Sequence, residues 1–260
     1  MHSNEKGRGI SMNRKGFSGK TAIITGAASG MGRVAARMLS QQGASVVLCD
    51  VNEKALCLVN DEISTDGKAY PCIADVRRYA DAEKAVLLAL KKTSRIDLLL
   101  NFAGGWEPRM LGSMKPFHEQ PVDVIDWGID VNLRGAIYFT RACLPTMVAQ
   151  GSGVVCCVGS VNGYFGDAMG PMYGVAKSGL FNFVKSVALD GASYGVRAFC
   201  VSPGPVMTRP GMATMKTPLN RGASPEEVVE FILYLCSDKG SFVTGSNHVI
   251  DGGFLAMRPK

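Results

Sequence analysis

The 260-residue sequence has no apolar run that reaches the roughly 18 residues needed to cross a membrane. Its first nine residues are polar and contain two glycines, so they form no apolar core of a secretory signal. We therefore expect a cytoplasmic protein with no membrane segment. Residues 1–16 are expected to be a disordered extension, and Met12 is an alternative start to Met1.

The sequence also lacks the spacings that indicate disulfide bonds or metal sites. The eight cysteines include no C-x-x-C pair, and the adjacent Cys156 and Cys157 would point to opposite faces of a strand. Like these two, Cys49 and Cys200 lie in apolar runs, where a free cysteine behaves as a small hydrophobic residue. The three histidines have no partner spacing that suggests zinc. We expect a reducing compartment and no metal ligand.

Charged residues of one sign do not cluster in any part of the sequence. The net charge of +6 is spread along the sequence, and no basic stripe is interleaved with aromatic residues. Such a stripe is the usual footprint of nucleic-acid binding, so we expect no nucleic-acid partner. No linker rich in Pro, Gly and Ser interrupts the chain, and residues 17–260 are therefore expected to form one domain.

What the sequence does have is a regular alternation of apolar strands and amphipathic helices. This order predicts an α/β fold, a doubly wound Rossmann-like domain whose parallel seven-stranded sheet carries helices on both faces. The expected strands are residues 21–25, 45–49, 69–74, 96–101, 153–159, 196–201 and 247–250. The expected helices are residues 30–42, 53–65, 79–93, 123–149, 172–194 and 225–237, the last with Ser224 as N-cap and Pro225 at its first position.

The segment Tyr173-Gly-Val-Ala-Lys177 places a phenol and an ammonium four residues apart. On a helix these positions share a face. A free phenol has a pKa of about 10 and is a poor proton donor at neutral pH. A neighbouring cation favours the phenolate and so makes a tyrosine usable as a general acid or base. Ser160, thirteen residues earlier, could hold a substrate oxygen beside the phenol, unless the Tyr-Lys pair is merely an exposed part of a helix surface.

A glycine-rich turn follows the first expected strand. The sequence Gly26-Ala-Ala-Ser-Gly30-Met-Gly32 lies between that strand and a helical pattern, where glycines let the backbone approach a phosphate. The next strand ends in Asp50, in the zone of an acidic residue that accepts hydrogen bonds from an adenosine ribose. Asp50 could instead cap the following helix, and the two roles are compatible.

These motifs resemble those of the short-chain dehydrogenase/reductase family, and the resemblance covers residues 18–254. The matching elements are Thr25, Gly26, Gly30 and Gly32 of the TGxxxGxG motif, the pair Asp75-Val76, the segment Asn101-Phe102-Ala103-Gly104, Asn132, Ser160, Tyr173, Lys177, and the segment 202–208. Two positions depart from the family pattern. Phe102 replaces the usual second Asn, and Ser202 replaces the usual Asn before Pro-Gly.

The resemblance implies a catalytic tetrad of Asn132, Ser160, Tyr173 and Lys177. Tyr173 would exchange a proton with the substrate oxygen, to which Ser160 would donate a hydrogen bond. Lys177 would bind the nicotinamide ribose, and Asn132 would hold a water that links Lys177 to solvent. The implied cofactor site contains Gly26, Ser29, Gly30, Met31, Gly32, Asp50, Val51, Asp75, Val76, Asn101, Ala103, Gly104, Tyr173, Lys177, Pro203, Gly204, Val206 and Thr208. Residues 17–150 would hold the cofactor, and residues 151–260 would supply the catalytic and substrate half, with a lid at 205–222.

The stretch between Gly104 and Asn132 is longer than is common in the family. It is either a surface Ω-loop packed on its own side chains or a contact to the substrate. The expected substrate residues are Trp106, Ser160, Phe165, Tyr173, Met207 and Met212, and further cleft candidates are Met110, Phe117, Met169 and Met215. This largely apolar set favours a cyclic alcohol, steroid or bile acid.

Other functions stay open at this stage. A 3-oxoacyl thioester is an alternative substrate, although reductases of that type in the family usually prefer NADPH. A non-catalytic dinucleotide-binding relative is an alternative of another class. A sugar-nucleotide epimerase or dehydratase is disfavoured, because the TGxxGxxG spacing and the longer C-terminal domain of those relatives are missing.

The charge at the end of the second expected strand favours NAD(H) over NADP(H). Asp50 would repel the extra phosphate of NADPH, and neither Ser29 nor Val51 could neutralise it, so we expect NAD(H). Arg33 should point away from this site. Family resemblance and the apolar residues Phe181 and Phe183, expected on outer helix faces, suggest a homo-oligomer, most simply a tetramer.

Overall fold

The structure is a computed structural model that describes residues 16–64, 68–212 and 216–257. Residues 1–15, with the possible start Met12, lie outside the described residues, as do the candidate Met215 within the expected lid and the last residues 258–260. Among the described residues, no helix combines the length and apolarity that spanning a membrane requires.

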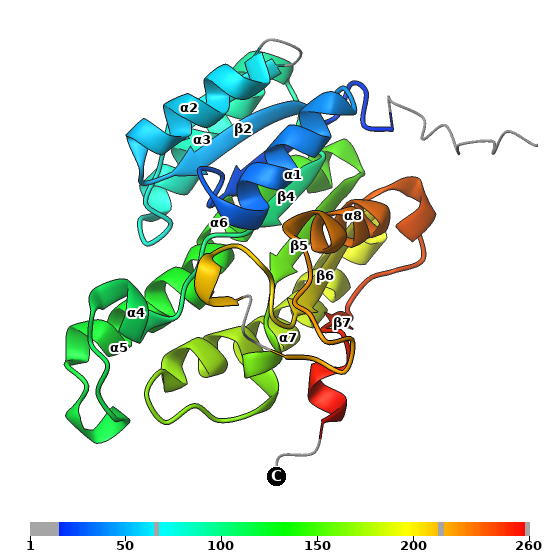
Figure 1. The fold of residues 1–260 in the computed structure, drawn as a ribbon. Helices are drawn as coiled ribbons and strands as arrows, with labels where there is room; N and C mark the ends of the chain where they lie inside the picture. Colours follow the sequence, from blue (N-terminus) through cyan, green and yellow to red (C-terminus); the bar gives the residue numbers. More distant parts are fainter. Residues whose placement is uncertain (1–15, 65–67, 213–215, 258–260) are drawn as a thin grey trace, which may run out of the picture.

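Seven parallel strands form one sheet in the order β3-β2-β1-β4-β5-β6-β7 (Figure 1). They are β1 (Thr21–Thr25), β2 (Ser45–Asp50), β3 (Lys68–Ile73), β4 (Leu98–Asn101), β5 (Gly153–Val158), β6 (Val196–Pro203) and β7 (Asn247–Ile250). The chain builds outward from β1 to β3 and then returns to place β4 on the other side of β1. Ligands of open parallel sheets bind at the carboxyl ends of the strands where this reversal occurs. The predicted doubly wound α/β fold is confirmed.

Helices cover both faces of the sheet, which explains the nearly continuous apolar runs of the strands. One face packs against α1 (Gly30–Gln41), α2 (Glu53–Ser64) and α8 (Pro225–Cys236). The other packs against α3 (Tyr79–Thr93), α6 (Gly135–Gln150) and α7 (Pro171–Gly191). Neighbouring residues of β1 alternate between the two cores, since Ile24 belongs to the first and Ile23 to the second.

The predicted start of α8 is confirmed by its hydrogen bonds. The hydroxyl of Ser224 accepts from the backbone N–H of Glu227 at 3.2 Å, and the carboxylate of Glu227 accepts from the N–H of Ser224 at 2.8 Å. This reciprocal capping box satisfies two N–H groups that the first turn of the helix leaves free. Pro225 follows at the first helical position, where it has no N–H to lose.

The predicted helix 123–149 is confirmed to within one residue at each end, but it contains a π-helical turn that was not predicted. It consists of α5 (Val122–Ile129), a π-helical turn (Asp130–Arg134) and α6. The stretch before it, expected as a loop, contains a further helix, α4 (Glu107–Leu111), and a 3-10 turn (Phe117–Glu119). Other boundaries move by one to three residues: β4 begins at Leu98, β6 extends to Pro203, and α7 ends at Gly191.

The expected exposure of Phe181 and Phe183 is also wrong. Both side chains are only partly exposed and pack against the core beneath α7. The ring of Phe181 lies 5.0 Å from that of Tyr164. These two residues therefore present only part of their side chains to a partner.

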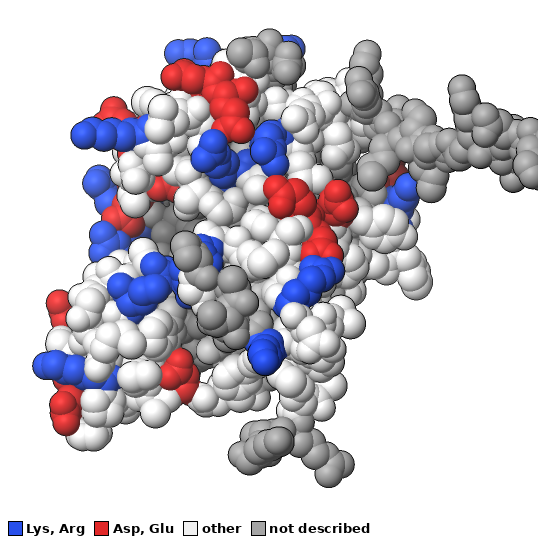
Figure 2. Space-filling view, in the orientation of Figure 1, with Lys and Arg blue, Asp and Glu red and all other residues white. Residues whose placement is uncertain are grey.

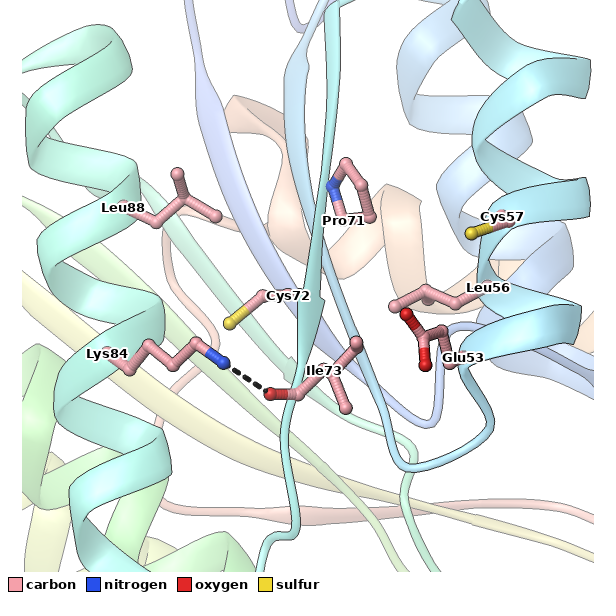
Figure 3. A pocket seen from close by; sticks show the side chains of 8 residues that line it. All are labelled: Glu53, Leu56, Cys57, Pro71, Cys72, Ile73, Lys84 and Leu88. Atoms are coloured by element: carbon pink, nitrogen blue, oxygen red, sulfur yellow. Dashed lines mark hydrogen bonds between the residues drawn. The ribbon is translucent and has the colours of Figure 1, made fainter.

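A depression of about 400 Å³ lies at the outer edge of the sheet, around β3 (Figure 3). Cys72 of β3 points toward α3, whereas Cys57 lies on α2, on the other side of the strand (Figure 3). Pro71 has no N–H, and the ammonium of Lys84 donates to the carbonyl of Ile73 at 2.9 Å. Both features occupy the free edge of the sheet and hinder pairing with another strand. The depression is lined by residues of α2, β3 and α3, and by none of the predicted site residues.

Candidate active site

The glycine-rich turn between β1 and α1 is packed too tightly for side chains. A Cβ on Gly32 would lie 2.2 Å from the carbonyl oxygen of Gly26, and one on Gly26 would lie 2.8 Å from the backbone nitrogen of Ala103. Gly26 and Gly30 also have positive φ angles of 68° and 51°. Helix α1 then begins without a side-chain cap from Ser29, and its first turn holds no acidic residue. This is a cradle that fits the phosphates of a dinucleotide.

Asp50 faces this turn from the end of β2. One carboxylate oxygen accepts from the N–H of Ala28 at 3.0 Å, and the other accepts from the N–H of Asn52 at 2.9 Å. Arg33 points to α2, where its guanidinium binds the carboxylate of Glu62 at 2.7 and 3.0 Å. The expectation that Arg33 turns away from the ribose site thus agrees with its contacts. A negative charge remains at the place expected for the adenosine ribose.

The other predicted cofactor residues near the sheet have structural partners. Arg77 binds the carboxylate of Asp75 at 2.6 to 3.0 Å, and this bond lowers the pKa of Asp75 below its usual value. Val76 is buried, and a Cβ on Gly135 would lie 2.7 Å from it, so its side chain packs against α6. Asn101 donates to the thiol of Cys157 at 3.7 Å, while no described residue donates to its buried Oδ1.

Asn132 lies in the π-helical turn, which is a common device at functional sites. Its side-chain oxygen accepts from the N–H of Gly105 at 2.9 Å. Its side-chain nitrogen donates to the carbonyls of Gly105 and Gly128, both at 2.9 Å. A Cβ on Gly104 would lie 2.7 Å from this side-chain oxygen and 3.3 Å from Nζ of Lys177. The structure therefore brings Asn132, Lys177 and the end of β4 together.

Helix α7 carries Tyr173 and Lys177 on one face, as predicted from their spacing. The Lys177 ammonium lies 5.4 Å from the centre of the Tyr173 ring and is buried, with 4% exposure. It donates to the carbonyl of Val158, at the end of β5, at 2.7 Å. Ser160 follows two residues later and is buried as well. Its hydroxyl accepts from the N–H of Asn162 at 3.1 Å and donates to the side-chain oxygen of the same residue at 3.4 Å.

The segment after β6 completes the wall of the site. Thr208 lies against the glycine-rich turn, because a Cβ on Gly30 would be 3.5 Å from its methyl group. Met207 is held by a bond from its N–H to the carbonyl of Ala223 at 2.8 Å, and its side chain is exposed. Ser202, the departure from the family pattern, donates to Asn247 at 2.8 Å, and Asn247 donates to the hydroxyl of Tyr164 at 2.6 Å.

Comparison with known proteins agrees with this geometry. Residues 26–255 match the family model described as Enoyl-(Acyl carrier protein) reductase. The chain belongs to the short-chain dehydrogenase/reductase family. It is 35% identical to cyclohexanol dehydrogenase of Acinetobacter sp. (strain SE19), over 92% of this chain and 96% of the relative.

Two further members of the family are similar over nearly their whole length. The 3-oxoacyl-[acyl-carrier-protein] reductase FabG of Thermotoga maritima is 34% identical over 92% of this chain and 99% of its own. A solved structure of 7α-hydroxysteroid dehydrogenase, complexed with NADH and 7-oxo glycochenodeoxycholic acid, superposes with a TM-score of 0.84 at 28% identity. That match covers 93% of this chain and 96% of the other.

The long segment between Gly104 and Asn132 is called the insertion below. It makes contacts that the family motifs do not predict. It is partly an Ω-loop on its own side chains, since Ser113 donates to Gln120 at 2.7 Å. It also docks on the segment that precedes α7. The N–H of Phe117 donates to the carbonyl of Ala168 at 3.0 Å, and the side-chain nitrogen of Gln120 donates to the backbone carbonyl of Met169 at 2.9 Å.

The expected substrate residue Trp106 takes part in this docking. Its indole N–H donates to the carboxylate of Asp167 at 2.9 Å, and the ring covers Gly170, where a Cβ would lie 2.0 Å from the indole nitrogen. Phe165 is exposed and its ring lies 6.2 Å from that of Phe254. Met212 is partly exposed and its N–H donates to the carbonyl of Arg209. The indole edge of Trp106 is therefore occupied by the protein itself.

Glu107 is a residue of the site that the sequence did not reveal. Its side chain is 2% exposed, and one carboxylate oxygen accepts from the backbone N–H groups of Met172 and Tyr173, at 3.0 and 3.2 Å. The other oxygen is buried, and no described residue donates to it. Burial raises the pKa of Glu107 above its usual value. A carboxylate from the insertion thus caps the helix that carries Tyr173.

Proposed function

We propose that the protein is an NAD(H)-dependent oxidoreductase that interconverts a secondary alcohol and a ketone on an apolar cyclic substrate. The observation that carries this proposal is the position of Tyr173. Its ring shares a face of α7 with the buried ammonium of Lys177, 5.4 Å away, beside Asn132 and the glycine-rich edge of the sheet. Membership in a family of oxidoreductases supports the same assignment.

Each residue then has a role that its contacts permit. A dinucleotide held by the glycine-rich turn and Asp50 would supply hydride chemistry at the substrate carbon. Tyr173 exchanges the proton of the substrate oxygen. The hydroxyl of Ser160 accepts a hydrogen bond from the N–H of Asn162 and donates to the side-chain oxygen of Asn162 at 3.4 Å. If this proton turned to the substrate oxygen instead, it would stabilise the charge that grows there. Lys177 keeps a fixed positive charge beside the phenol, because the carbonyl of Val158 holds its ammonium in place.

The remaining predicted residues complete the proposed assignment. Asn132 would fix the backbone next to Lys177 and hold the water that supplies protons from solvent. The cofactor half would be residues 17–150, and the catalytic half residues 151–260 with a lid at 205–222. Asp50 would select NAD(H), because it faces the site with a negative charge and Arg33 is paired with Glu62.

An apolar cyclic substrate is supported by the relatives and by exposed side chains. Phe165, Met169 and Met207 are each more than a third exposed on the segments around Tyr173. One relative is named for cyclohexanol, and the similar solved structure holds a bile-acid derivative. A second candidate is reduction of a 3-oxoacyl thioester, favoured by the 34% identity to FabG and by the matching family model.

A substrate screen tests the proposal. The purified protein is incubated with NADH and cyclohexanone, with NAD and cyclohexanol, and with NADH and a 3-oxoacyl thioester, while absorbance of NADH is followed. We expect turnover of the cyclic pair and little of the thioester. Binding of NADH without turnover of any ketone would instead indicate a non-catalytic relative.

We further propose a cytoplasmic homotetramer. Apolar side chains on α7 and near the C-terminus support assembly, since Leu189 is 83% exposed and Phe242 is fully exposed. The expected pairing is through α5 and α6 with α7, and through α8 with β7. A monomeric mass in light scattering at micromolar concentration would contradict it.

A further inference from the structure

A row of three polar side chains connects the edge of the sheet to the segment that carries Ser160. The hydroxyl of Ser202, near the end of β6, donates to the side-chain oxygen of Asn247 at 2.8 Å. The side-chain nitrogen of Asn247, the first residue of β7, donates in turn to the hydroxyl of Tyr164 at 2.6 Å. Tyr164 ends the 3-10 turn (Val161–Tyr164) that Ser160 caps. Two neighbouring strands are therefore joined to the far end of the turn that follows Ser160.

The near end of the same segment rests directly on Ser202. Gly159, which immediately precedes Ser160, has no room for a side chain, because a Cβ there would overlap the hydroxyl oxygen of Ser202. The N–H of Gly159 also donates to the carbonyl of Val201 at 2.8 Å, and Ser202 is completely buried. Ser160 thus lies between two points that Ser202 holds, one by direct packing and one through Asn247.

Hydrogen bonds, rather than ion pairs, fix this part of the described chain. No ion pair within residues 16–64, 68–212 and 216–257 includes a residue of β6, β7 or the turn after Ser160. Figure 2 shows largely uncharged surface over the 3-10 turn Phe254–Ala256, which follows β7 and is red in Figure 1. The half-exposed ring of Tyr164 packs against Phe181, but apolar packing has no preferred direction. The bond from Asn247 therefore sets where this ring lies.

The position of Ser160 matters because its hydroxyl has to turn from Asn162 to the substrate oxygen in the proposed reaction. Its bond to the side-chain oxygen of Asn162 is long, at 3.4 Å, and hence weak. A donor stabilises a growing negative charge when it lies about 2.7–3.1 Å from the charged oxygen. A small movement of the segment would place the serine hydroxyl beyond that range.

We propose that Ser202, Asn247 and Tyr164 are positioning residues for Ser160. They act through residues 159–164, which they hold so that the serine hydroxyl reaches the substrate oxygen beside Tyr173. Ser202, where the family usually has Asn, then has a role of its own, because its short side chain fits against Gly159 and still reaches Asn247. This inference rests on the proposed oxidoreductase function and adds positioning residues to the same site.

Hydrogen exchange tests the positioning without any turnover. Asn247→Leu keeps the size of the side chain and removes both of its hydrogen bonds, while Tyr164→Phe removes only the hydroxyl. In the full-length protein, we expect peptides that contain residues 159–165 to exchange about 2- to 10-fold faster in both variants, as the loss of a neutral hydrogen bond allows. Tyr194→Phe is the matched control, since Tyr194 is 49% exposed and Tyr164 50%, and it should leave these peptides unchanged.

A double-mutant cycle then tests whether the effect reaches Ser160. With NADH and cyclohexanone, Asn247→Leu should lower kcat by about 2- to 10-fold and leave the KM for NADH unchanged. In the Ser160→Ala background the same substitution should have almost no effect on kcat, because the hydroxyl that it displaces is already absent. A purely structural role of Asn247 would lower kcat equally in both backgrounds.

The other outcomes reject different statements. An unchanged exchange rate at residues 159–165 in both variants overturns the inference, as does an equal loss of kcat with and without the Ser160 hydroxyl. Faster exchange with an unchanged kcat overturns it too. If the unmodified protein turns over no ketone, the proposed function fails, and the exchange rates of Asn247→Leu and Tyr164→Phe alone decide whether the three side chains hold the Ser160 segment.

Discussion

Substitution of Glu107 tests whether the insertion positions α7, the helix that carries Tyr173. The carboxylate crosses from α4 to the first turn of α7, where one oxygen holds the backbone N–H groups of Met172 and Tyr173. Glu107→Ala removes the acceptor of both. A buried donor without a partner costs about 1–3 kcal/mol, and loss of a helix cap costs about 0.5–2 kcal/mol. We therefore expect the free energy of unfolding to fall by about 2 kcal/mol.

The effect on turnover follows from the identity of the second N–H group. It belongs to Tyr173 itself, so the start of α7 can shift when the acceptor is lost. A displacement of about 1 Å in a catalytic group can cost on the order of 100-fold in rate. We expect kcat of Glu107→Ala to fall by about 10- to 100-fold. Glu107→Gln keeps an oxygen acceptor and should restore most of the lost kcat.

The ionisation of Glu107 predicts how the stability of the protein depends on pH, which is a second quantity to measure. Because burial raises its pKa in the folded protein, its contribution to stability is fully present below the pKa of the unfolded chain. That contribution is lost as pH rises through the higher folded pKa. The glutamine variant has no such proton, so its stability relative to the parent should increase between pH 4 and pH 7.

Urea unfolding at several pH values and steady-state kinetics check both effects. Glu119 provides the matched control, because it lies in the same insertion but is exposed, and Glu119→Ala should change neither quantity. A folded Glu107→Ala protein with the kcat of the parent would refute the positioning role. A stability difference between the glutamine variant and the parent that is constant with pH would refute the assignment of the raised pKa.

Three further predictions follow from single contacts. Tyr173→Phe should keep NADH binding, measured by fluorescence, but lose nearly all turnover, and activity within about tenfold of the parent would contradict a role as proton donor. The parent should prefer NAD(H) over NADP(H) by at least about tenfold in kcat/KM, or about 1.4 kcal/mol, and Asp50→Ala should reduce this margin; equal efficiencies would overturn the assignment. Iodoacetamide should label Cys57 fastest in the folded protein, because the other seven cysteines are buried, and burial raises the pKa of Cys157 to about 12. A labelling rate that is unchanged in Cys57→Ser would contradict it.

The strands could be predicted to within about three residues because both faces of the sheet are covered. Under that condition nearly every strand residue is apolar, and all five residues of β1 are buried. The short helix α4 could not be predicted, since it has only five residues and contains Pro108, a pattern that also suits a loop. Phe181 was misplaced, because spacing along α7 does not show that Tyr164 packs against it.

The site residues that could be predicted are those whose spacing along the chain indicates a shared position in the fold. Tyr173 and Lys177 share a helix, so their relation is local. Glu107 lies 66 residues away from Tyr173 along the chain. No periodicity along the chain connects such residues, because their contact exists only after the insertion has docked on α7.

The π-helical turn shows how the end of β4 is tied to the same assembly. The side-chain nitrogen of Asn132 donates to the carbonyl of Gly128, which in a regular α-helix would accept the backbone N–H four residues later. The N–H of Gly135 reaches instead to the carbonyl of Asp130, five residues back. This widened turn lets Asn132 hold both backbone groups of Gly105, where the insertion begins.

The insertion therefore has two fixed points, and each leads to a different member of the proposed tetrad. Its first residue, Gly105, is held by Asn132, and Gly104 leaves no room for a side chain between Asn132 and Lys177. Two residues further on, Glu107 holds the N–H of Tyr173. A change in the insertion that moved α4 would shift Tyr173 through Glu107, while Lys177 would stay fixed by the carbonyl of Val158. The distance between phenol and ammonium would then change, so the insertion would also set the geometry of the proton transfer proposed for Tyr173.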